Sequence, residues 1–283
     1  MEDSLPVITS QPRVLYVTDL AYEARGRRYC DEDIYVTSRL RDHFHLALCP
    51  PQAALGLMDL FDAVVVRNSG PVLGYQAAYD AFRERALASG TRVYNQLTGR
   101  ADMVGKNYLV ELTSAGYPVI PTIDRVEHLD RLPRAGGYVV KPKRGADSVG
   151  LQFLPLDKVA AALDHDGETL AQPRIDFDYE VSFYFVDDEF QYALHAPRRD
   201  RRWEMTVYEP SDEDLAFARR FIAWNTIDHG IQRVDACRAP NGELLLVEVE
   251  DLNPYLSLDL LDDAQRDRFV QSLRRALTRL LAA

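Results

Sequence analysis

The feature that most constrains this chain is a predicted β-hairpin between residues 233 and 250. The pair Asn241-Gly242 separates two runs of strand-forming residues, and Asn-Gly is the strongest two-residue signal for a tight hairpin turn. If these two residues form the loop, Pro240 faces Glu243, and the register of every pair further from the turn follows by counting outward. The sequence therefore predicts which side chains of the two strands share a face.

Counting outward brings four charged side chains together on one face of the hairpin. Asp235 is expected to lie opposite Glu248, and Arg233 opposite Glu250. Because side chains alternate along a strand, the other face is apolar and is expected to form the buried layer. That predicted buried face consists of Val234, Ala236, Leu245, Val247 and Val249.

The charged face of this hairpin sets two carboxylates side by side. Directly paired residues have Cβ atoms roughly 4.5–5.5 Å apart, and two carboxylates at that distance repel unless a cation or a proton lies between them. Magnesium prefers oxygen ligands, so Asp235, Glu248 and Glu250 are predicted to bind a divalent ion. The amide oxygen of Asn253 offers a further ligand. The alternative is a solvated face on which Arg233 forms ordinary surface salt bridges.

Charge and composition exclude several other classes of function. The 283 residues carry 33 basic and 44 acidic side chains, a net charge of −11, without a long block of either sign, so nucleic acid is not an expected partner. Three distant cysteines match neither a disulfide framework nor a zinc ribbon. The acidic start MEDSLPVITSQP is unlike a signal peptide, and no apolar run reaches membrane-spanning length. We expect a cytoplasmic protein with no membrane partner; its oligomeric state stays open, a homodimer included.

Strand-like and helix-like segments alternate over the first hundred residues, which predicts a small open α/β sheet. The continuous apolar run Ala63–Val66 is typical of a parallel strand that is buried on both faces. Gly90 is expected to end the helix that follows this strand. The other predicted elements here are strands at Val14–Val17, Leu46–Leu48 and Thr91–Tyr94 and helices at Ile34–His43 and 75–88.

The second part of the chain changes to antiparallel strand pairs and capped helices. Thr98 is predicted to cap a helix that runs to Ala115, with Gly116 as its stop. The remaining predicted elements are the strand pair Glu180–Val186 and Glu189–His195, a helix with a capping box at Ser211 and Asp214, and a final helix over Asp263–Leu281.

A basic loop after a predicted strand is a candidate for phosphate binding. Lys141 lies near the end of the run Tyr138–Pro142, and the loop from Lys143 to Gly150 includes Ser148. Backbone N–H groups of such a loop can bind phosphate oxygens while lysines supply positive charge, although a plain surface turn is the alternative. P-loop, G-x-G-x-x-G and G-x-S-x-G motifs are absent, and the six histidines show no metal-ligand spacing beyond one His-x-His pair.

Taken together, these segments resemble the ATP-grasp superfamily, whose members bind ATP between two α+β subdomains. The most specific part is RVDACRAPNGELLLVEVEDLNP, which looks like the metal-binding hairpin of the family, with Asp235 and Glu248 as magnesium ligands. Glu250 stands where many members have asparagine. In that respect the segment is more similar to the branch of the cycloserine-forming cyclo-ligase, in which Asn253 aligns with another acid. Arg233 matches the arginine that stabilises the transferring phosphoryl group.

The resemblance assigns further residues to nucleotide and substrate. Lys106 and Lys141 match the two ATP lysines, and Glu180 stands where the family places its ribose-binding acid. The segment that looks like the adenine-binding hinge is Gln172, Pro173, Arg174 and Ile175. The expected substrate-binding residues are Arg67, Asn68 and Ser69, which follow a predicted strand, and Arg198 or Arg199.

The resemblance implies an α/β and α+β fold in three parts. An N-terminal α/β domain is expected over residues 1–100, an ATP-grasp subdomain with the phosphate-binding loop over 101–175, and a C-terminal subdomain with the hairpin over 176–283. The implied activity is ADP-forming carboxylate-amine ligation through an acylphosphate, as in glutathione-synthetase-like enzymes. ATP, Mg²⁺ or Mn²⁺, and small amino-acid-like substrates are implied, intramolecular cyclisation included, with Lys141 and Arg233 as catalytic residues. A small-molecule kinase and a non-catalytic nucleotide-binding regulator are the alternatives.

Overall fold

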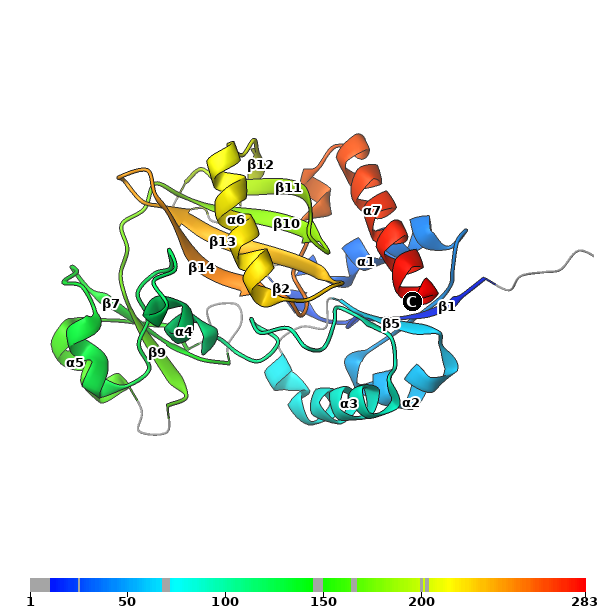
Figure 1. Cartoon of the computed structure of the whole chain (residues 1–283), viewed down its shortest axis with the longest axis horizontal. Helices are drawn as coiled ribbons and strands as arrows, with labels where there is room; N and C mark the ends of the chain where they lie inside the picture. Colours follow the sequence, from blue (N-terminus) through cyan, green and yellow to red (C-terminus); the bar gives the residue numbers. More distant parts are fainter. Residues whose placement is uncertain are drawn as a thin grey trace, which may run out of the picture.

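The computed structural model describes residues 11–24, 26–67, 72–144, 150–163, 167–198, 201 and 204–283. These residues form a four-stranded, a five-stranded and a three-stranded sheet together with a two-stranded ribbon. Figure 1 shows the three-stranded sheet at one end of the molecule and the four-stranded sheet at the other, with the five-stranded sheet between them. No helix within the described ranges combines the length and the apolarity that a membrane crossing requires.

The four-stranded sheet is parallel, with the strand order β4-β1-β5-β6. All four residues of β5 (Ala63–Val66) are buried, as expected for a central parallel strand with both faces covered, so the predicted α/β sheet is confirmed. Gly90 ends the helix α3 (Gln76–Ser89) with a φ of 66°, also as predicted. The other elements of this region are β1 (Arg13–Val17), β2 (Glu23–Ala24), β3 (Arg27–Arg28), α1 (Cys30–Leu40), β4 (His45–Cys49), α2 (Ala54–Leu57) and β6 (Val93–Tyr94).

The five-stranded sheet is antiparallel, with the order β12-β11-β10-β13-β14, and α6 (Asp212–Asn225) packs on one face. Its strands are β10 (Tyr179–Val186), β11 (Glu189–Ala196), β12 (Thr206–Tyr208), β13 (Ile231–Arg238) and β14 (Leu244–Glu250). The predicted capping box is confirmed, since Ser211 accepts the backbone N–H of Asp214 and the Asp214 carboxylate accepts that of Ser211. Phe221 of α6 packs with Phe183 and Val234 of the sheet.

The three-stranded sheet consists of β8 (Gln152–Leu154), β7 (Tyr138–Pro142) and β9 (Thr169–Pro173), with α5 (Leu156–Ala162) packed beside β7. One stretch of chain after α4 (Tyr108–Ser114) links this sheet to the five-stranded one. Val119 bridges to Leu246 of β14, and Ile123 bridges to Ala171 of β9. The two antiparallel sheets are therefore tied together on one side of the space between them. Short 3₁₀ turns lie at Pro51–Ala53, Met58–Leu60, Val72–Gly74, Val126–Arg131 and Leu258–Leu260.

The C-terminal helix α7 (Asp263–Ala282) joins the parallel sheet to the five-stranded sheet. It begins one residue after the Asp262 cap and contacts α1, β10 and β11. Phe269 of α7 shares one buried cluster with Tyr16 of β1 and Tyr184 of β10. The two sheets thus share a core, and the division of the chain at residues 100 and 175 stays a prediction.

Two predicted helices differ from the structure at their ends. The helix expected to begin at Thr98 begins only at Tyr108, because the preceding segment bonds elsewhere: the backbone N–H groups of Ala101 and Met103 donate to the carboxylate of Asp251. Gly105, with a φ of 95°, also breaks helical geometry just before α4. The helix expected at Ile34–His43 is α1, which begins at Cys30 and has three acidic residues in its first turn, where the helix dipole favours them.

The hairpin of β13 and β14 corrects the predicted turn but keeps the predicted pairs. The Ala239 N–H donates to the Glu243 carbonyl, so the loop has three residues rather than two, and Pro240 does not face Glu243. A bulge at Val247 adds a second one-residue shift, and the two shifts cancel. Asp235 therefore pairs with Glu248 and Arg233 with Glu250, as predicted. Between the turn and the bulge, the side chains of β14 lie on the opposite faces to those predicted. The buried residues there are Leu244 and Leu246, not Leu245 and Val247.

Gly99 lies where a larger residue would collide with the buried carboxylate of Asp251. A Cβ at this position would stand 2.2 Å from Oδ2 of Asp251 and 3.6 Å from a methyl carbon of Ile227. We expect Gly99→Ala to lower the free energy of unfolding by about 1–3 kcal/mol in urea titrations. Gly56→Ala is the matched control, because a Cβ at Gly56 in α2 meets nothing within 4 Å. Equal stability of the two variants would contradict the placement of Asp251.

Candidate active site

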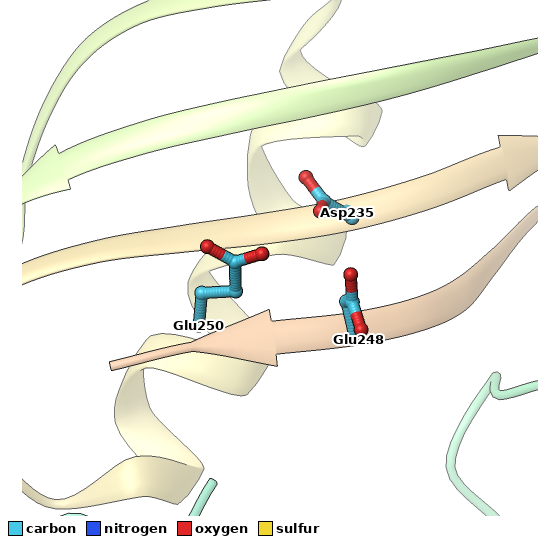
Figure 2. A group of neighbouring side chains, drawn as sticks. All are labelled: Asp235, Glu248 and Glu250. Carbon is cyan, nitrogen blue, oxygen red and sulfur yellow. The ribbon is translucent and has the colours of Figure 1, made fainter. Parts of the chain in front are cut away.

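Three carboxylates of the hairpin come together on one face of the five-stranded sheet. One oxygen from each of Asp235, Glu248 and Glu250 lies within 4.8 Å of the other two, and the three side chains are half-buried. Figure 2 shows Asp235 on β13 and both glutamates on β14, with their carboxyl groups gathered over the two strands. Oxygen donors at this spacing suit a hard divalent ion. The fourth predicted ligand, Asn253, is half-buried three residues beyond β14.

Arg233 pairs with two of these carboxylates. Its guanidinium donates to both oxygens of Asp235, at 2.7–3.1 Å, and to Glu250 at 2.5 Å, and its Nη1 donates to the Tyr255 carbonyl at 3.1 Å. Burial by itself would lower the pKa of Arg233, but Asp235 and Glu250 raise it above its usual value, so the group stays cationic. Burial and the charges of Glu248 and Asp235 raise the pKa of Glu250, which Arg233 opposes. The predicted catalytic arginine thus lies beside the three carboxylates that are predicted to bind a metal ion.

Lys106 lies on the other side of the same face. Its Nζ donates to both oxygens of Asp102, at 3.1 and 3.2 Å, and also to Oε2 of Glu248. Burial by itself would raise the pKa of Glu248, but the positive charges of Lys106 and Lys141 lower it to about 2. Sequence reasoning missed Asp102, whose spacing of four residues from Lys106 was its sole signal.

The loop that carries Asp102 and Lys106 is held by a second acid that sequence reasoning missed. The fully buried carboxylate of Asp251 accepts the N–H groups of Ala101 and Met103, at 3.1 and 2.7 Å, and the side-chain amide of Asn225 at 3.1 Å. Burial raises the pKa of Asp251, and these three donors oppose that shift. Asp251 directly follows Glu250 in sequence, so the loop is fixed to the end of β14.

Two further predicted nucleotide lysines belong to the three-stranded sheet. Lys141 is the fourth residue of β7, and its charge acts on Glu248 across the space between the sheets. Lys143 follows β7, and its Nζ lies 2.9 Å from Oδ2 of Asp124. The Lys143 carbonyl accepts the backbone N–H of Lys106 at 2.9 Å, which joins the two lysine-bearing segments. Ser148 lies outside the described residues.

The predicted hinge begins inside β9 and leads into β10. Gln172 and Pro173 are the last residues of β9, and the buried Gln172 donates to the Thr122 hydroxyl at 2.8 Å. The Arg174 guanidinium lies over the ring of Phe153, 5.7 Å from its centroid. Phe153 is 65% exposed although it pairs with Val139 in the sheet, and sequence reasoning missed this exposed ring. The remaining predicted nucleotide residues are Ile175, half-buried after β9, and Glu180, half-buried near the start of β10.

Two of the predicted substrate residues, Arg67 and Arg198, lie among the described residues, and each pairs with acidic side chains. Arg67 has no exposed surface: its guanidinium donates to Asp33 at 3.0 Å, to Glu32 at 2.8 Å and to the Pro254 carbonyl at 2.9 Å. Arg198 is 48% exposed and pairs with Glu204. The other three predicted residues, Asn68, Ser69 and Arg199, lie outside the described residues.

The contacts of Arg67 indicate a structural role. We expect Arg67→Met to lower the free energy of unfolding by about 3–5 kcal/mol, because Glu32 and Asp33 would keep buried charges without their cation. Arg85→Met removes an exposed arginine that pairs with Asp59 at 2.8 Å, and it should change stability by less than about 0.5 kcal/mol. Urea unfolding followed by circular dichroism measures both. A loss for Arg67→Met as small as that of the control would refute the structural role.

Known proteins resemble this chain over most of its length, although no protein-family profile matches it. The cycloserine biosynthesis protein DcsG of Streptomyces lavendulae is 28% identical over 253 residues, which cover 77% of this chain and 84% of DcsG. The crystal structure of the D-cycloserine synthetase DcsG superposes with a TM-score of 0.72 at 25% identity, over 94% of this chain and 99% of that one. D-alanine–D-alanine ligase from Bacillus anthracis, complexed with ATP, superposes with a TM-score of 0.64 at 14% identity, over 96% and 99%.

The ATP-grasp ligase PsnB, complexed with a phosphomimetic variant of its minimal precursor, Mg and ADP, superposes with a TM-score of 0.63 at 18% identity, over 95% of this chain and 99% of PsnB. Each of these three likenesses covers at least 94% of this chain. DcsG is thus similar to this chain both in sequence and in fold. This chain has the ATP-grasp fold and is an enzyme similar in sequence and structure to ATP-grasp ligases.

Proposed function

We propose that this enzyme uses ATP to join a small-molecule carboxylate to an amine, with an acylphosphate as intermediate and ADP and phosphate as products. The observation that carries the proposal is the face on which Asp235, Glu248 and Glu250 meet Lys106 and Arg233. Phosphoryl transfer needs oxygen ligands for a divalent ion and cations where negative charge develops, and this face offers both. The ligases among the structural neighbours support the same chemistry.

In this proposal the triphosphate lies between the three-stranded and five-stranded sheets. Lys106, Lys141 and Lys143 bind its oxygens, and the hairpin carboxylates with Asn253 hold Mg²⁺, or Mn²⁺ in its place. The adenine base would contact backbone groups of the hinge and the exposed ring of Phe153. That hinge consists of Gln172, Pro173, Arg174 and Ile175. Glu180 is proposed to bind the ribose. The use of ATP and the three buried free cysteines are consistent with a cytoplasmic enzyme.

The chemistry divides into two displacements. A carboxylate oxygen of the first substrate attacks the γ-phosphorus of ATP, the bond from that phosphorus to the bridging oxygen breaks, and ADP leaves. The amine nitrogen then attacks the carbonyl carbon of the acylphosphate, phosphate leaves with the electron pair of the broken C–O bond, and the nitrogen gives its proton to solvent. Lys141 and Arg233 supply fixed positive charge beside the transferring group, and bound metal neutralises phosphate charge. No nucleophile from the protein is required.

For the substrates we propose small amino-acid-like molecules, because the relative DcsG is named for cycloserine biosynthesis and another neighbour for joining two alanines. Intramolecular cyclisation is included in this class. A screen of amino acids and related carboxylates, singly and in pairs, for phosphate release should find active substrates, and mass spectrometry of the product should show loss of water between the two groups. Hydroxylamine added with the carboxylate alone should be converted to a hydroxamate. A stable phosphorylated product without a hydroxamate would instead identify a kinase.

Replacement of Glu248 tests the metal face directly. We expect Glu248→Gln to lower turnover by at least about a hundredfold, since one charged oxygen ligand of the divalent ion is lost. Steady-state phosphate release measures this change, and circular dichroism checks that the fold is kept. Glu243→Gln is the control, because Glu243 is exposed at the turn of the same hairpin. Near-normal turnover of Glu248→Gln would contradict the proposed role of this face in metal binding.

A further inference from the structure

Each carboxylate of the candidate metal site is already paired with a side-chain cation. Lys106 donates to Glu248, and Arg233 donates to both Asp235 and Glu250. Lys106 donates to Oε2 of Glu248, and the charge of a divalent ion bound by the three carboxylates would repel an ammonium group held against one of them. Metal binding is therefore expected to displace Lys106 from Glu248.

Lys106 has a second anchor, the carboxylate of Asp102, which would remain if Glu248 bound the metal ion. Both oxygens of Asp102 accept from its Nζ, and the Lys106 side chain is only 9% exposed. Asp102 lies between Ala101 and Met103, whose N–H groups donate to Asp251, so the anchor itself is held in place. A small rotation of the ammonium group about this anchor would turn its third donor from Glu248 to another acceptor.

We propose that Lys106 is an exchangeable cation of this site and that Asp102 is its positioning residue. Without nucleotide, Lys106 neutralises Glu248. When metal and nucleotide bind, Glu248 turns to the metal, and Lys106 turns to a phosphate oxygen while Asp102 keeps it in place. The exchange makes binding of metal and nucleotide cooperative, because each one removes the partner that blocks the other. This inference rests on the proposed function, since it assumes a nucleotide phosphate as the acceptor.

Two substitutions test this exchange, and the sign of the second separates it from a static ion cluster. Lys106→Met removes the cation that competes with metal for Glu248, so Mn²⁺ alone should bind about tenfold more tightly. Asp102→Asn should weaken binding of Mg-ADP by about tenfold, because the lysine loses its anchor. Simple electrostatics predicts the reverse for Asp102→Asn, since removal of a negative charge near the site favours an anionic nucleotide.

The experiment uses the full chain. Electron paramagnetic resonance measures Mn²⁺ affinity without nucleotide, and isothermal titration calorimetry measures Mg-ADP affinity, for the wild type, Lys106→Met, Asp102→Asn and Lys158→Met. Lys158 is exposed on α5, so Lys158→Met makes the same charge change away from the site and should leave both affinities unchanged. Circular dichroism confirms the fold of each variant.

Three results would overturn the exchange: unchanged or weaker Mn²⁺ binding by folded Lys106→Met, Mg-ADP binding by Asp102→Asn that equals or exceeds that of the wild type, or the same gain of Mn²⁺ affinity in Lys158→Met. Because Asp102→Asn conserves shape, it decides the question if Lys106→Met does not fold. A wild-type protein that binds no Mg-nucleotide would instead refute the proposed function. Normal wild-type binding with an unaffected Asp102→Asn would refute only the exchange.

Discussion

The buried carboxylate of Asp251 is the constraint on which the candidate site depends. Burial of this charged group is unfavourable unless donors surround it, and the N–H groups of Ala101 and Met103 and the amide of Asn225 supply them. Because of those contacts, the segment from Thr98 to Asn107 is not part of the helix that the sequence predicts there. Because Asp251 directly follows Glu250, the same contacts place the loop with Lys106 beside β14, which carries two of the predicted metal ligands. Lys106, which donates to Glu248, is therefore positioned by Asp251. Asp251 itself binds neither metal nor nucleotide in the proposed mechanism.

A second set of buried contacts joins the parallel sheet to the loop after β14. Glu32 of α1 accepts the N–H groups of Leu256 and Ser257, and it also pairs with Arg67 after β5. One residue before Leu256, the Tyr255 carbonyl accepts from Arg233. Three hydrogen bonds thus lead from the proposed catalytic arginine through Glu32 to Arg67, the residue after β5 of the parallel sheet.

How much of the site could be predicted is best judged from the hairpin. The sequence predicted the pairs Asp235 with Glu248 and Arg233 with Glu250, and both are confirmed. The prediction succeeded although its turn was one residue too short, because the bulge at Val247 restored the register. Between turn and bulge it was wrong, and Leu246 rather than Leu245 is buried. A bulge leaves no reliable signal in a run such as Leu-Leu-Leu-Val, in which every residue suits a buried strand.

The sequence by itself determined the parallel sheet, the capping box of α6 and the gathering of acids on one strand pair, because strand period, turn residues and caps act over a few neighbouring positions. Only the tertiary structure decided the partners of these residues. Asp251 meets Ala101 across 150 positions, Glu248 meets Lys106 across 142, and Arg67 meets the Pro254 carbonyl across 187. Such contacts follow from the packing of whole sheets, so no local pattern shows that Arg67 is buried or that Asp102 faces the metal site.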